Sequence, residues 1–158
     1  MATGLNPSEK TFRRAETRTW LRILGLHGRI FSALNRSLNA TLGLSLAKFD
    51  VLAQLDQHPE GITLGLLSER LQVTGGNVSG LVQRLLADDL IVKQMSETDR
   101  RSFLVRLSPK GERVFREACE IHRAKLEELF AKVPDEELDD AFAILNSIGR
   151  HVQEGLNG

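Results

Sequence analysis

The sequence predicts a mostly α-helical fold that carries one small β-hairpin. Over most of the 158 residues, apolar side chains recur at the three- and four-residue spacing of amphipathic helices. Between residues 90 and 107 the pattern changes to two short β-rich segments around a polar loop, which is typical of a hairpin. Capping residues and turn signals divide the remainder into separate helices. The order of these elements decides which architecture is possible.

The first predicted elements are two helices of unequal length. Apolar residues on one stripe predict a long helix over residues 11–41. Gly43 stands where a left-handed C-terminal cap belongs. Ser45 can cap a second helix, which ends before the turn signal at His58-Pro59.

Two short helices follow, and each starts at a threonine. Thr63 caps the helix Leu64–Leu71, and Thr74 caps a helix that runs to about Asp88. Two short helices joined by a tight turn form a helix-turn-helix, whose second helix fits the major groove of duplex DNA. This pair is therefore the feature of the sequence that points most directly to nucleic acid.

A β-hairpin is predicted directly after the helix-turn-helix. Its strands are residues 90–95 and 103–107, and the polar loop between them is residues 96–102. A hairpin in this position makes the predicted architecture a winged helix-turn-helix, in which the hairpin is the wing. The wing loop contains Arg100 and Arg101, which can enter a minor groove or pair with phosphate.

Two more helices complete the chain. Ser108-Pro109 supplies a capping hydroxyl and a proline at the first helical position, so a long helix is expected over about residues 109–131. Pro134 interrupts it, and the acidic run that follows favours the start of a last helix.

The predicted organisation is a DNA-binding lobe between dimerisation helices. We assign residues 43–108 to the winged helix-turn-helix lobe, residues 1–42 to an N-terminal segment and dimerisation helix, and residues 109–158 to C-terminal dimerisation helices. The first and last helices have apolar faces that must be buried, and a twofold-symmetric interface is the commonest solution. The alternative is that both helices fold back on their own lobe.

Charge is distributed unevenly along a chain whose formal net charge is zero. Residues 1–111 carry 15 Lys and Arg against 10 Asp and Glu, whereas residues 112–158 carry 6 against 11. A basic front and an acidic tail fit a protein with one nucleic-acid face, and they equally fit a chance asymmetry with a solvated acidic helix. Apolar runs are too short for a membrane span, no secretory signal is visible, and the single Cys119 favours a cytoplasmic protein.

The predicted recognition helix begins with small and neutral polar residues. Small residues let the backbone approach phosphate or base edges closely, and amide side chains such as those of Asn77 and Gln83 can read adenine. The alternative is that these residues only cap a surface helix. The candidate DNA-binding residues are Thr74, Gly75, Gly76, Asn77, Ser79, Gly80, Gln83, Arg84, Asp99, Arg100 and Arg101.

Two motifs in this region resemble the multiple-antibiotic-resistance regulator (MarR) family of winged-helix regulators. One is the run from Asp99 to Gly111, which resembles the family's Asp-x-Arg, strand and Leu-Ser/Thr…Gly pattern. The other is Val78–Leu85 followed by Leu90-Ile91, which resembles its recognition helix and the entry to its wing. By this resemblance, Asp99 and Arg101 match the family's wing residues.

The resemblance implies a function and partners. It implies a homodimer that binds a pseudo-palindromic site on double-stranded DNA and responds to a small-molecule effector. The expected role is a transcription regulator, typically a repressor, that a small aromatic or phenolic compound releases from its operator.

The chain departs from the family pattern at two places in the recognition helix. Gly80 stands where many relatives have a basic residue, and Asp88-Asp89 stands where they often have Lys-Lys-Gly. Fewer phosphate-neutralising groups predict weaker non-specific affinity for DNA, without a change in the mode of binding.

The effector site and any redox role rest on few residues. Trp20, His27 and Phe31 lie on one stripe of the first helix and could line an effector pocket, although packing in the core or in an interface is the favoured explanation. Cys119 could act as a redox switch if nearby basic residues lower its pKa, and packing in the helix is the alternative.

Enzymes are the main rival class. No metal-ligand spacing, phosphate loop or dinucleotide motif occurs, so no catalytic residue, metal or cofactor is expected. A winged-helix protein-interaction module without an effector is the other alternative, and the basic wing counts against it.

Overall fold

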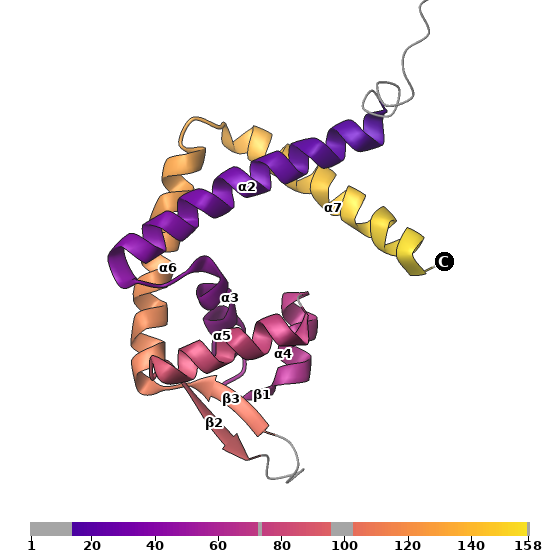
Figure 1. Cartoon of the computed structure of the whole chain (residues 1–158). Coiled ribbons are helices and arrows are strands. Elements are labelled where there is room, and N and C mark those ends of the chain that lie inside the picture. Colours follow the sequence, from indigo (N-terminus) through magenta and orange to yellow (C-terminus); the bar gives the residue numbers. More distant parts are fainter. Residues whose placement is uncertain (1–13, 73, 96–102, 158) are drawn as a thin grey trace, which may run out of the picture. The chain divides into compact units, whose positions relative to one another are not determined.

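The computed structural model describes residues 14–72, 74–95 and 103–157 and confirms the mostly helical fold with a small antiparallel sheet (Figure 1). The chain forms two compact units, Met1–Lys125 and Leu126–Gly158, and each is described by itself. In the described ranges the helices are α2 (Ala15–Leu42), α3 (Leu46–Asp56), α4 (Leu64–Leu71), α5 (Gly75–Ala87), α6 (Pro109–Phe130) and α7 (Asp135–Asn157). None of these helices has the length and apolar character needed to cross a membrane.

Local capping signals position the helices as expected at three places. Gly43 has φ +62° and its N–H donates to the carbonyl of Asn39, which ends α2. The hydroxyl oxygens of Ser45 and Thr63 each accept a backbone N–H three residues ahead, at 3.3 Å, so α3 and α4 begin where the sequence predicts.

The expected side-chain cap at Thr74 is absent. Thr74 is the residue before α5, but its hydroxyl accepts no capping hydrogen bond. The first turn is closed instead by its backbone carbonyl, which accepts from the N–H groups of Asn77 and Val78. The Thr74 side chain is therefore left at the surface.

The sheet contains one strand that the sequence did not indicate. Strands β2 (Ile91–Met95) and β3 (Phe103–Leu107) form the predicted hairpin, and β1 (Ile62–Thr63) pairs with the other edge of β3 in the order β1-β3-β2. Two residues are too few for a periodic signal, so β1 is defined only by its pairing with β3, in which Ile62 lies opposite Val105.

The core of the first unit lies beneath the helix-turn-helix. It is formed by side chains from every helix of the lobe and from the sheet. On α5, Val78, Val82 and Leu85 are buried as predicted. Leu81, which was also predicted to face the core, is only half-buried. The largest fully buried side chains are Leu38, Leu52, Leu55, Ile62, Leu67, Leu85, Val51, Val78 and Val105.

The C-terminal half of α2 is joined to this core. Leu34 and Leu38 are buried, and the Asn35 side-chain oxygen accepts the backbone N–H of Leu46 at 2.9 Å. The N-terminal half differs, because Trp20 and Leu24 are exposed within the chain. The predicted division into lobe and dimerisation helices stays a prediction.

Candidate nucleic-acid interface

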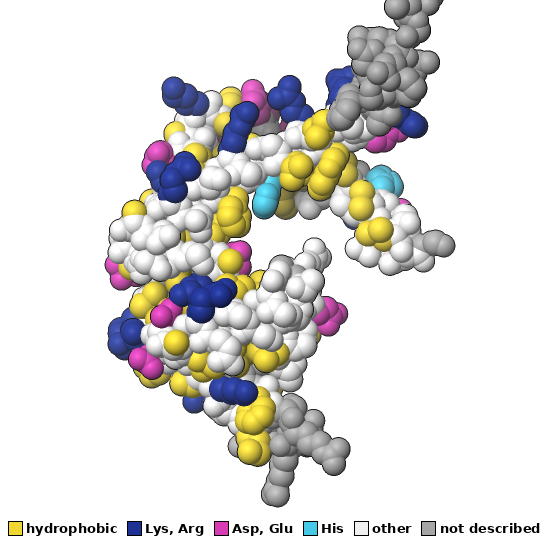
Figure 2. All heavy atoms as spheres, in the orientation of Figure 1, with side chains coloured by type: hydrophobic (Ala, Val, Ile, Leu, Met, Phe, Trp, Pro, Cys, Tyr) yellow, Lys and Arg dark blue, Asp and Glu magenta, His cyan; other side chains and the backbone are white. Residues whose placement is uncertain are grey.

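The face of α5 opposite the core carries the predicted DNA-binding residues. Thr74, Asn77 and Gln83 are exposed, as are the glycines at the helix start, Ser79 and Arg84, and Gly80 is half-exposed. The surface around the start of α5 is mainly uncharged in Figure 2. The helix therefore presents small and neutral polar groups outward while its apolar face is buried.

A positive charge lies over the glycine in the middle of this face. Asn77, Gly80 and Arg84 share one stripe of α5, since they are three and four residues apart. The two terminal nitrogens of Arg84 lie 3.8 and 3.9 Å from where a Cβ on Gly80 would be. Arg84 thus reaches back one turn and supplies a cation close to Gly80, the position where the resemblance noted in the sequence implies a basic residue.

The turn between α4 and α5 holds the two helices as a helix-turn-helix (Figure 1). Gln72 ends α4 in a left-handed conformation with φ +53°, and its N–H donates to the carbonyl of Glu69 at 3.1 Å. Leu67 of α4 is fully buried. This packing fixes α4 behind α5 and leaves the start of α5 accessible.

The wing is described only at its strands. Asp99, Arg100 and Arg101 lie outside the described residues. On the strands, Met95 pairs with Phe103 and both are exposed, and the Lys93 ammonium lies 4.0 Å from the centre of the Phe103 ring.

Sequence reasoning did not single out these wing strand residues. The sequence signal that could have identified them is the spacing of Lys93 and Met95. Residues two apart share one face of a strand, so both side chains are expected on the same face of β2. On the other face, Arg106 donates from Nε to the side-chain oxygen of Gln94 at 3.1 Å.

The predicted effector residues are exposed side chains of α2. Trp20 is 59% exposed and Phe31 is 39% exposed, and the rings of His27 and Phe31 lie 5.8 Å apart. They are therefore not core residues of the first unit. None of them lines a pocket of about 290 Å³ in the first unit, which is formed by Leu42, Gly43, Leu44, Asp88, Leu90, Lys110 and Val114.

The redox hypothesis for Cys119 required a lowered thiol pKa, but the pKa is shifted in the opposite direction, which favours the alternative of packing in the helix. Burial raises the pKa of Cys119, and the carboxylates of Asp56 and Glu120 raise it further. A thiol with a raised pKa holds less thiolate, so it reacts more slowly with oxidants. Among the described residues, no three His, Cys, Asp or Glu side chains are grouped so that they could hold a metal ion.

Comparisons with known proteins agree with this geometry. The sequence model of a family described as the MarR family matches residues 42–102. A MarR family transcriptional regulator from Silicibacter pomeroyi is 42% identical, with 94% of this chain and 99% of that chain covered and a TM-score of 0.78.

Two further relatives are regulators as well. The organohalide-sensing transcriptional regulator RdhR, solved ligand-free and with 2,4-dichlorophenol bound, is 27% identical over 96% of this chain and 88% of its own, with a TM-score of 0.79. The HTH-type transcriptional regulator MhqR of Bacillus subtilis is 22% identical over 87% of this chain and 96% of its own length. These relatives are described as transcriptional regulators rather than as enzymes.

Proposed function

We propose, from the premise that this chain belongs to the MarR family of DNA-binding transcription regulators, that α5 reads the major groove of its operator. The observation that carries the proposal is the two-sided character of α5. Its apolar face is buried, and the opposite face presents Asn77, the small residues around it and the Arg84 guanidinium. Small residues permit close approach to base edges, the Asn77 amide supplies directed hydrogen bonds to a base, and the Arg84 guanidinium pairs with a phosphate.

The wing supplies a second contact in this proposal. Arg100 and Arg101 enter the minor groove or pair with phosphates beside the site that α5 reads, and Asp99 orients one guanidinium. Lys93 on β2 adds a further cation to the same hairpin.

The regulator acts as a homodimer. A single winged helix-turn-helix reads one half-site, and a twofold dimer places two such helices about one DNA turn apart. Support comes from the exposed apolar side chains of α2 and α7, several of which Figure 2 shows at the surface. The assembled protein binds a pseudo-palindromic operator.

A small aromatic or phenolic effector releases this dimer from DNA, which makes the protein a repressor. Support comes from RdhR, whose structure was determined with 2,4-dichlorophenol bound. In this chain, Trp20, His27 and Phe31 offer a flat apolar surface and an imidazole that can hydrogen-bond a phenol or carboxylate. An aromatic compound that binds the protein and lowers its operator affinity would be the effector.

The recognition role of α5 is tested with two substitutions, one of which should change the sequence preference and the other the overall affinity for DNA. A duplex is first selected from a randomised pool by binding to the unsubstituted protein. Asn77→Ala should lower the preference for the selected duplex over random DNA, by about tenfold if one bidentate base contact is lost. Arg84→Ala should weaken binding to both duplexes and reduce the slope of log affinity against log salt by about 1.

Retardation assays at two salt concentrations measure both quantities. Asn146→Ala, an exposed amide on α7, is the matched control and should change neither. An unchanged preference for the selected duplex in the Asn77 variant would show that α5 is not the reading element.

A further inference from the structure

We infer that Asp88, at the C-terminal end of α5, is a positioning residue that holds the recognition helix at the orientation its operator requires. This inference rests on the proposed role of α5. It also accounts for an acidic residue that is unfavourable there on electrostatic grounds alone. A carboxylate at a helix C-terminus is repelled by the negative end of the helix dipole, and a carboxylate on a DNA-binding helix repels phosphate.

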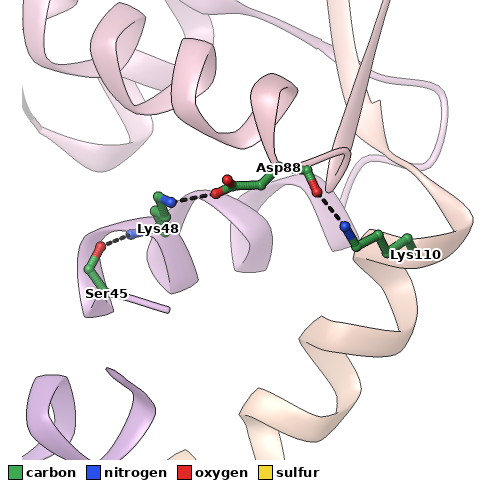
Figure 3. A network of polar contacts seen from close by, with 4 residues as sticks. All are labelled: Ser45, Lys48, Asp88 and Lys110. Atoms are coloured by element: carbon green, nitrogen blue, oxygen red, sulfur yellow. Dashed lines mark hydrogen bonds and ion pairs between the residues drawn. The ribbon is translucent and has the colours of Figure 1, made fainter. Parts of the chain in front are cut away.

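Asp88 is joined to two neighbouring helices at once (Figure 3). Its carboxylate oxygen lies 2.5 Å from the ammonium nitrogen of Lys48 on α3. Its backbone carbonyl accepts a hydrogen bond of 2.7 Å from the ammonium group of Lys110 on α6. The Lys48 side chain is only 16% exposed and that of Asp88 is 47% exposed, so water screens this ion pair less than a fully exposed one.

The same connections continue to α2. Lys48 lies in the first turn of α3, where its backbone N–H is bonded to the Ser45 hydroxyl. The N–H of Leu46, two residues earlier, is bonded to the side chain of Asn35 on α2. Hydrogen bonds and one ion pair therefore link α2, α5 and α6 to one another through the first turn of α3.

These contacts set where the start of α5 can point. The base-reading residues lie at the N-terminal end of α5, and Asp88 is bound at the other end. A helix fixed at its C-terminal end to α3 and α6 presents its N-terminal end in one direction. Loss of the Lys48 contact lets α5 adopt a wider range of orientations, which weakens base contacts that need close geometry more than it weakens phosphate contacts.

The next residue provides a matched control. Asp89 has φ +58°, and its backbone carbonyl accepts a 2.6 Å hydrogen bond from the hydroxyl of Ser108. No residue in the described ranges forms an ion pair with its side chain. Asparagine tolerates this left-handed conformation, so Asp89→Asn removes the same charge one residue away and leaves the backbone unchanged.

The experiment compares Asp88→Asn, Asp89→Asn and Lys48→Met in the full chain. Each variant is titrated with the selected duplex and with a random duplex of equal length, after circular dichroism shows that it is folded at the assay temperature. Asp88→Asn should weaken binding to the selected duplex by about threefold to fivefold, with little change on random DNA. Asp89→Asn should bind both duplexes as tightly as the unsubstituted protein or more tightly.

Lys48→Met approaches the same contact from α3 and should reproduce the loss. The double variant with Asp88→Asn should be no weaker than either single variant, because both substitutions remove one interaction. The inference is overturned if Asp88→Asn behaves like Asp89→Asn, or if the two single losses add. If the unsubstituted protein shows no preference for the selected duplex, or if Asn77→Ala leaves that preference unchanged, the proposed function fails instead, and the two failures are distinguishable.

Discussion

Gly111 shows how a single residue can be required by backbone proximity alone. It lies in the first turn of α6 and is buried against the chain that leaves α5. A Cβ at this position would lie 1.8 Å from the carbonyl oxygen of Leu90, a distance that no side chain can occupy. The Gly111 N–H also donates to the Ser108 hydroxyl at 2.9 Å. The glycine of the motif that resembles the MarR family is therefore explained by the approach of α6 to the start of β2.

Gly111→Ala should lower the free energy of unfolding by about 1–3 kcal/mol, because backbone rather than a flexible side chain must move. Chemical denaturation measures the change. Gly65→Ala is the control, since Gly65 is an exposed helical glycine at which an added Cβ would meet no neighbouring segment within 4 Å, and it should be neutral or stabilising. Equal stability of the two variants would contradict the steric argument.

At the scale of elements, α6 is attached to α3 by stacked rings. Phe49 of α3 lies 5.6 Å from Phe115 and 4.8 Å from His122, both on α6, and the imidazole is nearly parallel to the Phe49 ring. Burial lowers the pKa of His122 below its usual 6.5, and the carboxylate of Asp50 partly offsets this. The neutral imidazole is therefore the form that packs best between these helices.

This packing makes stability depend on pH. Because the pKa of His122 is lower in the folded than in the unfolded state, the unfolded chain binds more protons below the usual value of 6.5. The free energy of unfolding should consequently fall as the pH is lowered from about 7.5 to about 5.5. Asp50 acts in the opposite sense at more acidic pH, since burial raises its pKa.

Denaturation at several pH values measures this dependence. His122→Phe keeps an aromatic ring against Phe49 and removes the titrating group, so it should flatten the curve over the same interval. A variant that retains the full pH dependence would assign the effect to another group.

At the scale of the whole molecule, α7 carries a row of exposed apolar side chains along one face. No residue of α7 is buried within the chain as described. Phe142 is 69% exposed, Leu145 is 50% exposed and Val152 is 56% exposed, and these side chains recur at helical spacing on one face. An exposed face of this kind is typical of a protein interface, and we expect a second copy of the chain to cover it.

Phe142→Glu and Leu145→Glu should therefore shift the protein from dimer to monomer. A carboxylate on this face would be buried without a partner, which costs more than the apolar contact it replaces. Ile144→Glu is the control, because Ile144 is 60% exposed but lies on a different side of α7, and it should leave the dimer intact. Light scattering at several concentrations measures the mass, and a dimer that persists in both test variants would refute this assignment.

Much of the fold was predictable because its signals are local. The caps at Ser45 and Thr63, the left-handed Gly43 and the Ser108-Pro109 pair each act within one turn of chain. The end of α2 and the starts of α3, α4 and α6 therefore follow from sequence alone. The exposed face of α5 was predictable for a related reason, since a helix with a 3.6-residue period that buries Val78, Val82 and Leu85 must present the residues between them.

Sequence alone thus determined the class of the fold, the order of its helices and hairpin, and the helix that carries the candidate base contacts. Only the tertiary structure decided that β1 pairs with β3, that Arg84 lies over Gly80, and that Asp88 is bound by Lys48, 40 residues away along the chain. These features depend on distances that the packing of the whole core sets. Two of them, the pairing of β1 with β3 and the contact of Lys48 with Asp88, join segments that are remote in sequence. No local pattern of residues specifies such distances.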